Sequence, residues 1–88
     1  MTPPVPKHRP EPPYSEKAKA VRLQGRLVLW LVVGANGGVE QAAISRPLGL
    51  GLDESALRTV RTWTFEPATR NGVPTPVRVI AETSFRLF

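Results

Sequence analysis

Apolar and polar positions along the chain predict three strands. The first covers residues 26–33. Residues 27–33 are apolar at both odd and even positions, which is typical of a strand covered on both faces or with one face awaiting a partner. Asn36-Gly37, a dipeptide typical of tight hairpins, leads into a second strand over residues 39–45. Residues 77–88 alternate between apolar and polar side chains, which predicts a strand with one face in the core and one in solvent.

Two helices are predicted from capping residues and apolar spacing. Residues 16–23 follow Ser15, whose hydroxyl can cap the helix, and Gly25 is expected to end it. Asp53 is the expected N-cap of the second helix. The apolar face of that helix comprises Leu52, Ala56, Leu57, Val60 and Trp63. The order α-β-β-α-β indicates an α+β fold, a three-stranded antiparallel sheet with two helices packed on one face.

The first residues differ in composition from the rest. Residues 1–13 contain six of the ten prolines. Proline fixes φ and holds its predecessor extended, so this segment is expected to be a stiff, unpacked spacer, the end of a proline-rich linker, disordered or extended. A ligand for a proline-binding module is the alternative. The folded domain is then expected to span residues 14–88.

Composition excludes several classes of protein. The 88 residues suffice for one small domain, and its net charge of +5 is dispersed, which favours a solvated basic surface over a specific acidic partner. Cysteine is absent and His8 is the only histidine, which excludes disulfides, thiolate catalysis and histidine-based metal sites or triads. The sequence has neither a membrane-spanning apolar run nor a signal peptide, so any membrane anchor is expected outside this chain.

The residues that enzymes need are not grouped. No pair of the seven acidic residues has a spacing that suggests acid–base catalysis. The glycines of residues 34–38 lack the Lys-Ser/Thr ending of a phosphate-binding loop, and nothing resembles a calcium loop. We therefore expect no enzymatic activity, no cofactor and no metal.

Several short motifs occur together in a recognisable order. A helix runs into Trp63-Thr64-Phe65-Glu66-Pro67-Ala68, and shorter motifs flank it on both sides. These are Pro13-Tyr14-Ser15, Gly25-Arg26-Leu27-Val28, Asn36-Gly37-Gly38-Val39, Asn71-Gly72-Val73-Pro74 and Phe85-Arg86-Leu87. Over residues 13–88 the chain resembles the C-terminal domain of the TonB family. Ser15 departs from the pattern, because the family usually has proline there.

The resemblance implies a periplasmic domain of an energy transducer anchored in the inner membrane of a Gram-negative bacterium. Such a domain binds the TonB box of an outer-membrane receptor by strand addition. It thereby couples the proton-motive force to the import of siderophores or cobalamin. The implied partners are a TonB-dependent receptor and, through an N-terminal part outside this chain, an inner-membrane motor complex. Nucleic acid is not an expected partner, and the choice between monomer and homodimer stays open.

Strand addition needs a free sheet edge, because an incoming peptide pairs with the unpaired N–H and C=O groups there. If residues 77–88 lie at an edge, they form the best docking strand of the chain. The candidate partner-binding residues are Tyr14, Lys17, Val77, Arg78, Val79, Ile80, Ala81, Glu82, Thr83, Ser84, Phe85 and Arg86. Arg78, Glu82 and Arg86 either read the charges of the bound strand or guard the edge against aggregation. Lys17 either pairs with an acidic group of the receptor or is simply solvated.

Aromatic residues leave two other functions open. Trp63 and Phe65 are expected in the core, whereas Trp30 either packs under the helices or marks an exposed patch. A small nucleic-acid-binding module would stack bases on aromatic side chains such as Trp30, Phe85 and Phe88. A self-associating structural domain is the other alternative.

Overall fold

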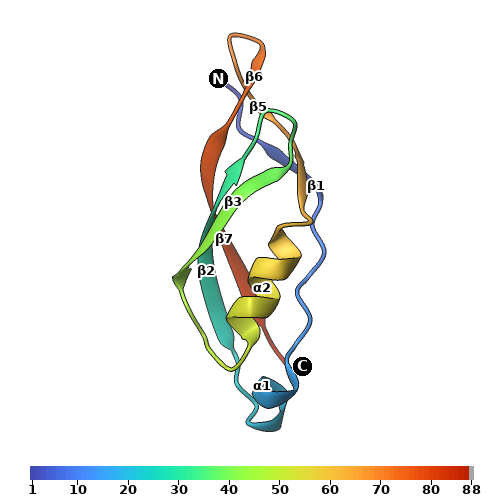
Figure 1. Ribbon diagram of the computed structural model, residues 1–88, viewed down its shortest axis with the longest axis vertical. Helices are drawn as coiled ribbons and strands as arrows, with labels where there is room; N and C mark the ends of the chain where they lie inside the picture. Colours follow the sequence, from blue (N-terminus) through green and yellow to red (C-terminus); the bar gives the residue numbers. More distant parts are fainter. Residues whose placement is uncertain (88) are drawn as a thin grey trace.

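A three-stranded antiparallel sheet forms the centre of the protein, whose computed structural model describes residues 1–87 (Figure 1). The strand order is β3-β2-β7, with β2 (Gly25–Val33) in the middle, β3 (Val39–Arg46) on one side and β7 (Val77–Phe85) on the other. The expected hairpin joins β2 to β3 through Asn36-Gly37. Phe88, the last residue of the predicted third strand, lies outside the described residues.

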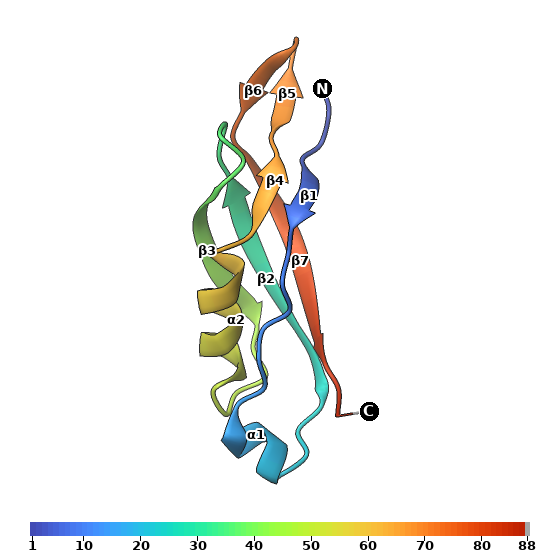
Figure 2. The same ribbon diagram turned by 90° about the vertical axis from the view of Figure 1, so that its right-hand side faces the viewer.

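The two predicted helices are present, and the α+β fold class is confirmed. Helix α2 (Leu52–Val60) lies along the inner face of the sheet, and α1 (Glu16–Ala20) closes one end of the molecule (Figure 2). The molecule is elongated, 49 × 20 × 17 Å. No helix within residues 1–87 is long and apolar enough to cross a bilayer.

The core lies between α2 and the inner face of the sheet. Its fully buried members on β2 are Leu27, Leu29, Leu31 and Val33, and those on α2 are Leu52, Ala56 and Val60. Trp63 and Phe65 are also buried, as expected from the sequence. On the opposite face of β2, Arg26 is exposed and the other residues are half-buried. Of the two interpretations of this apolar strand, the structure supports the one in which a single face is covered.

Helix α1 is shorter than predicted because its C-cap is not the expected glycine. Arg22 adopts the left-handed conformation, with φ 55°. Its N–H donates to Lys19 O at 3.1 Å, and the N–H of Leu23 donates to Ala18 O at 2.9 Å. These two bonds define a Schellman motif that ends the helix at Ala20. Gly25 instead begins β2.

Asp53 is not the N-cap of α2. Gly51, with φ 84°, holds that position, and Asp53 lies inside the first turn. The Asp53 carboxylate accepts hydrogen bonds from the N–H groups of Leu48 at 2.8 Å and Gly49 at 3.0 Å. Asp53 therefore stabilises the loop that precedes the helix. Ser15, in contrast, caps α1 as expected, because its Oγ accepts from Ala18 N–H at 3.2 Å.

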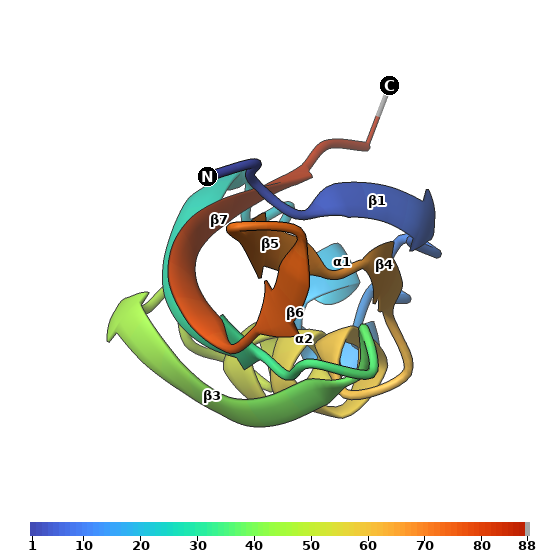
Figure 3. The same ribbon diagram turned by 90° about the horizontal axis from the view of Figure 1, so that it is seen from above.

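Four short strands were not predicted. They are β1 (Val5–His8), β4 (Thr64–Glu66), β5 (Ala68–Arg70) and β6 (Val73–Thr75). β5 and β6 form a small hairpin at the end of the long axis, and Figure 3 looks down on it. β1 pairs with β4, so the N-terminal segment is tied to the domain.

Candidate functional site: the free edge of β7

β7 is a regular edge strand. It pairs with β2 over nine residue pairs, from Gly25 and Phe85 to Val33 and Val77, without a register shift. Within residues 1–87, no strand pairs with its other side. Along that side, every second residue directs an N–H and a C=O away from the sheet. This row of unpaired groups is a template for one more strand.

The opposite edge of the sheet is a poorer template. The pairing of β3 with β2 has register shifts between Val28 and Leu29 and between Val32 and Val33. Bulges twist a strand and interrupt the even row of donors and acceptors that an added strand would need. The uninterrupted β7 edge is therefore the better docking edge.

The side chains of β7 alternate as the sequence predicts. On the inner face, Thr83 and Phe85 are buried, and the remaining inner residues, Val77, Val79 and Ala81, are half-buried. The outer row, Arg78, Ile80, Glu82 and Ser84, is exposed. Arg86 follows the strand and is also exposed. An added strand would place its own side chains beside each of these two rows.

Residues 2–13, which we call the strap, run along the domain (Figure 2). The expectation of an unpacked spacer is wrong. Trp63 Nε1–H donates to Pro10 O at 2.9 Å, and Ser55 Oγ–H donates to Pro13 O at 2.6 Å. The backbones of Thr2 and Thr69 also bond to each other, N–H to O, at 2.9 and 3.1 Å. The segment is extended as proline requires, but buried groups of the domain give its carbonyls partners.

The strap lies near β7 without pairing with it. Two neighbouring hollows, of about 270 Å³ and 230 Å³, are lined both by strap residues and by β7 residues. The two hollows share Arg9, Trp63 and Glu82 as lining residues, and we call them together the edge groove. One rim of this groove is the strap, and the other is the β7 edge.

Thr83 gives the edge groove an unused polar atom. The side chain is 8% exposed, and its Oγ1 is buried with no hydrogen-bond partner within the described part of the chain. Thr83 also lines the larger-volume hollow of the groove, beside Trp63 and Pro12. A buried hydroxyl without a partner costs free energy, so Thr83 is a point of local instability beside the groove.

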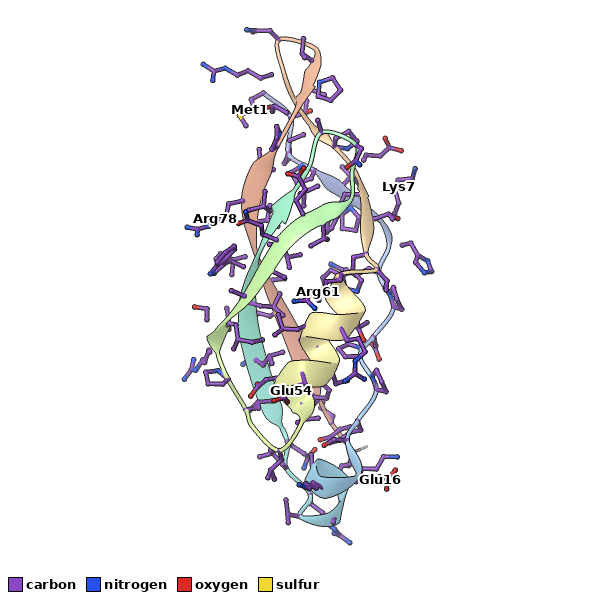
Figure 4. The ribbon with its side chains drawn as sticks, viewed as in Figure 1. Met1, Lys7, Glu16, Glu54, Arg61 and Arg78 are labelled. Atoms are coloured by element: carbon purple, nitrogen blue, oxygen red, sulfur yellow. The ribbon has the colours of Figure 1, made fainter. Side chains whose placement is uncertain are left out.

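Trp30 lies on the outer face of the sheet, away from α2. It is half-buried and stands opposite Ile80 in the ladder. The Arg78 guanidinium lies 4.3 Å from the centroid of its ring. Figure 4 shows Arg78 on the side of the sheet away from α2. Of the two positions that the sequence left open for Trp30, the structure shows the one outside the core.

The remaining two candidates, Tyr14 and Lys17, lie at the end of the molecule that α1 closes. The hydroxyl of Tyr14 donates to Leu23 O, and its ring packs edge-on against Phe85 at 5.3 Å between centroids. Tyr14 therefore supports the end of β7 rather than lining the edge groove. Lys17 lies on α1 with its side chain exposed. The sequence named Thr83 among the β7 candidates but did not indicate its buried, unpartnered hydroxyl, nor that the strap packs on the domain, because both depend on long-range contacts.

The described residues, 1–87, contain no group of three or more His, Cys, Asp or Glu side chains that could hold a metal ion. The single ion pair within that range joins Lys7 and Glu66 at 3.7 Å, with both side chains more than half exposed. Such a pair contributes little stability. The groups that the site offers to a partner are the unpaired N–H and C=O groups of β7 and the side chains beside them.

The fold and the free edge define a small α+β domain whose sheet can be extended by one strand. Residues 10–87 match the family described as Gram-negative bacterial TonB protein C-terminal, and the chain belongs to this family. Membership makes it a bacterial energy-transducer domain of the periplasm, from a family that interacts with outer-membrane receptors.

A solved structure has the same fold. The solution NMR structure of the Pseudomonas aeruginosa TonB C-terminal domain superposes with a TM-score of 0.74 at 18% sequence identity. The match covers 96% of this chain and 86% of that one. A comparison with curated protein sequences finds no match.

Proposed function

We propose that this domain binds the TonB box of an outer-membrane receptor by strand addition at the free edge of β7. The observation that carries the proposal is the nine-residue edge with regular pairing on one side only. Main-chain hydrogen bonds supply affinity in this mode, and pockets for alternate side chains supply specificity. The edge groove offers such space, with Trp63 and Thr83 among its lining residues.

The proposed partner-binding residues are those of β7 together with Arg86 and Lys17, and Tyr14 is proposed to act through the end of β7 that it supports. The domain acts as an interaction module without catalytic chemistry of its own. In the full protein it is carried by a proline-rich linker from an inner-membrane anchor and driven by a motor complex. The receptor it serves imports a siderophore or cobalamin. The independently folded unit is proposed to span residues 14–88, with the strap as an added N-terminal arm.

The nucleic-acid alternative finds little support at the outer face. Phe85 is 3% exposed and belongs to the core, where it packs against Tyr14. Base-stacking platforms need exposed aromatic rings on neighbouring strands. Within residues 1–87, Trp30 is the only aromatic residue that β2, β3 and β7 place on the outer face.

The first test is an amide NMR titration with a nine-residue TonB-box-type peptide. We expect shifts concentrated along residues 77–85, and slower hydrogen exchange for the β7 amides that face the free edge. A scrambled peptide controls for charge attraction to the basic surface. Repeating the titration at two protein concentrations separates peptide binding from a homodimer formed through the same edge.

Two N-methylated peptides make the test specific for strand addition. One is methylated at odd positions and the other at even positions, so their side chains are identical. Only one set of N–H groups can face β7, and each lost hydrogen bond is worth about 0.5–1.5 kcal/mol. We expect one peptide to lose about tenfold or more in affinity and the other to bind as the parent does. Equal affinities would contradict strand addition.

A further inference from the structure

The outer side chains of β7 form an ordered row of three chemical types. Arg78, Ile80 and Glu82 follow one another at every second position, so they lie about 6.4–6.8 Å apart along the strand. Ile80 is 67% exposed and lies between two charged residues, so its apolar surface is in contact with water. Within residues 1–87, neither Arg78 nor Glu82 takes part in an ion pair. The row is thus a cation, an apolar side chain and an anion, all facing solvent.

Trp30 fixes the first member of this row. In the ladder Trp30 stands opposite Ile80, and Val32 stands opposite Arg78. Arg78 therefore reaches diagonally over the indole ring, at 4.3 Å from its centroid. A guanidinium stacked on an aromatic face keeps its N–H groups free at its edge, where they can bind a carboxylate. The stacking also limits the rotamers of the arginine, so less entropy is lost on binding.

An added strand would bring its own outward side chains beside this row. Residues directly opposite on neighbouring strands have Cβ atoms about 4.5–5.5 Å apart, and opposite charges at that distance attract while like charges repel. The apolar surface of Ile80 would be covered by the facing residue. The row would therefore discriminate among peptides whose backbones bind equally well.

We propose that Arg78, Ile80 and Glu82 select the strand that adds to β7. The selected peptide carries an acidic residue, an apolar residue and a basic residue at alternate positions. Trp30 acts as a positioning residue for Arg78. This inference rests on the proposed strand addition and names the chemistry of the strand that the edge prefers.

The test uses four nine-residue peptides with a central leucine and identical intervening residues. The residues two positions before and after the leucine are Glu and Lys, Glu and Glu, Lys and Lys, or Gln and Gln. The two like-charged peptides and the glutamine peptide present the same pattern in either strand direction. The glutamine peptide reports strand addition itself.

Two variants make the row uniform in charge, and each has a control with the same net charge. Glu82→Arg gives two cations and is compared with Glu54→Arg, on the exposed side of α2. Arg78→Glu gives two anions and is compared with Arg58→Glu, also exposed on α2. We expect Glu82→Arg to bind the Glu/Glu peptide, and Arg78→Glu the Lys/Lys peptide, about three- to tenfold more tightly than its control does.

The glutamine peptide separates the two levels of the proposal. If it binds all proteins equally and each variant matches its control with every peptide, strand addition stands and the selecting row is refuted. If no peptide shifts the amides of β7, strand addition itself is refuted and the selecting row with it. Added salt should reduce the preferences without changing the affinity for the glutamine peptide.

Trp30→Leu tests the positioning role. The substitution keeps an apolar residue opposite Ile80 but removes the aromatic face under Arg78. We expect the preference for Glu/Lys over Gln/Gln to fall about twofold or more, with the affinity for Gln/Gln unchanged. An equal loss of affinity for all four peptides would show that Trp30 acts only through the structure of the sheet.

Discussion

Replacing Trp63 by alanine is expected to remove most of the domain's free energy of unfolding. The indole is 5% exposed and lies next to Phe65, with 6.5 Å between ring centroids. Its Nε1–H is also the donor to Pro10 O. Removing a buried tryptophan costs about 3–5 kcal/mol. A domain of this size has a free energy of unfolding near the lower end of about 5–15 kcal/mol.

Urea unfolding followed by circular dichroism measures this loss. Trp63→Phe is the informative comparison, because it keeps most of the buried apolar surface and removes the donor to Pro10. We expect that variant to lose about 1–2 kcal/mol, the cost of a missing hydrogen bond and a small cavity. Val73→Ala, at a residue 62% exposed, is the neutral control. A typical substitution lowers the free energy of unfolding by about 1 kcal/mol. A loss no larger than this for Trp63→Ala would contradict the role of Trp63 in the core.

Gly37→Ala is expected to destabilise the domain by about 2–4 kcal/mol, from backbone strain and a lost hydrogen bond. Gly37 has φ 86°, and a Cβ atom there would lie 2.0 Å from the carbonyl oxygen of Phe65. Its own carbonyl accepts from Phe65 N–H at 2.8 Å. The hairpin tip therefore approaches β4 at a distance that only glycine allows. An alanine must push the two backbones apart.

Gly72→Ala provides a matched control for this close approach. Gly72 also has a positive φ, 77°, but nothing lies within 4 Å of the position of a Cβ atom. We expect a loss of about 1–2 kcal/mol there, from backbone conformation alone. Thermal unfolding of both variants gives the difference. Equal melting temperatures would show that the contact with Phe65 contributes nothing beyond the left-handed conformation.

Local patterns predicted the elements that depend on local chemistry. The hairpin follows from Asn36-Gly37, the first helix from Ser15, and the third strand from the alternation that ends near Phe85. The helix caps were predicted less well. Arg22 takes the left-handed position where glycine was expected, because two Schellman hydrogen bonds hold it there. Asp53 lies two residues after the N-cap, Gly51, and bonds to the loop instead.

The sequence predicted a docking strand at residues 77–88 only on the condition that this strand lies at a sheet edge. Whether it does depends on the strand order, which is set by long-range contacts. The short strands β1 and β4 are three to four residues long and carry no periodicity that a sequence pattern can reveal. The strap was misjudged for a related reason. Its prolines correctly indicate an extended chain, but they say nothing about the indole of Trp63 that binds the carbonyl of Pro10.

The strap also determines how the domain would respond to tension. A pull on Met1 would load the contacts of the strap one after another, first the pairing of Thr2 with Thr69, then β1 on β4, then Pro10 on Trp63. All four residues of β1 are exposed, whereas β7 and β2 share nine residue pairs. We therefore expect the strap to peel at a lower force than the sheet, as a separate early step in a pulling experiment.

Peeling releases about 40 Å of chain. The point of attachment then moves from one end of the long axis to the other, beside α1. A domain holding a partner at β7 would thus lengthen its connection to the rest of the chain before the strands of its own sheet separate.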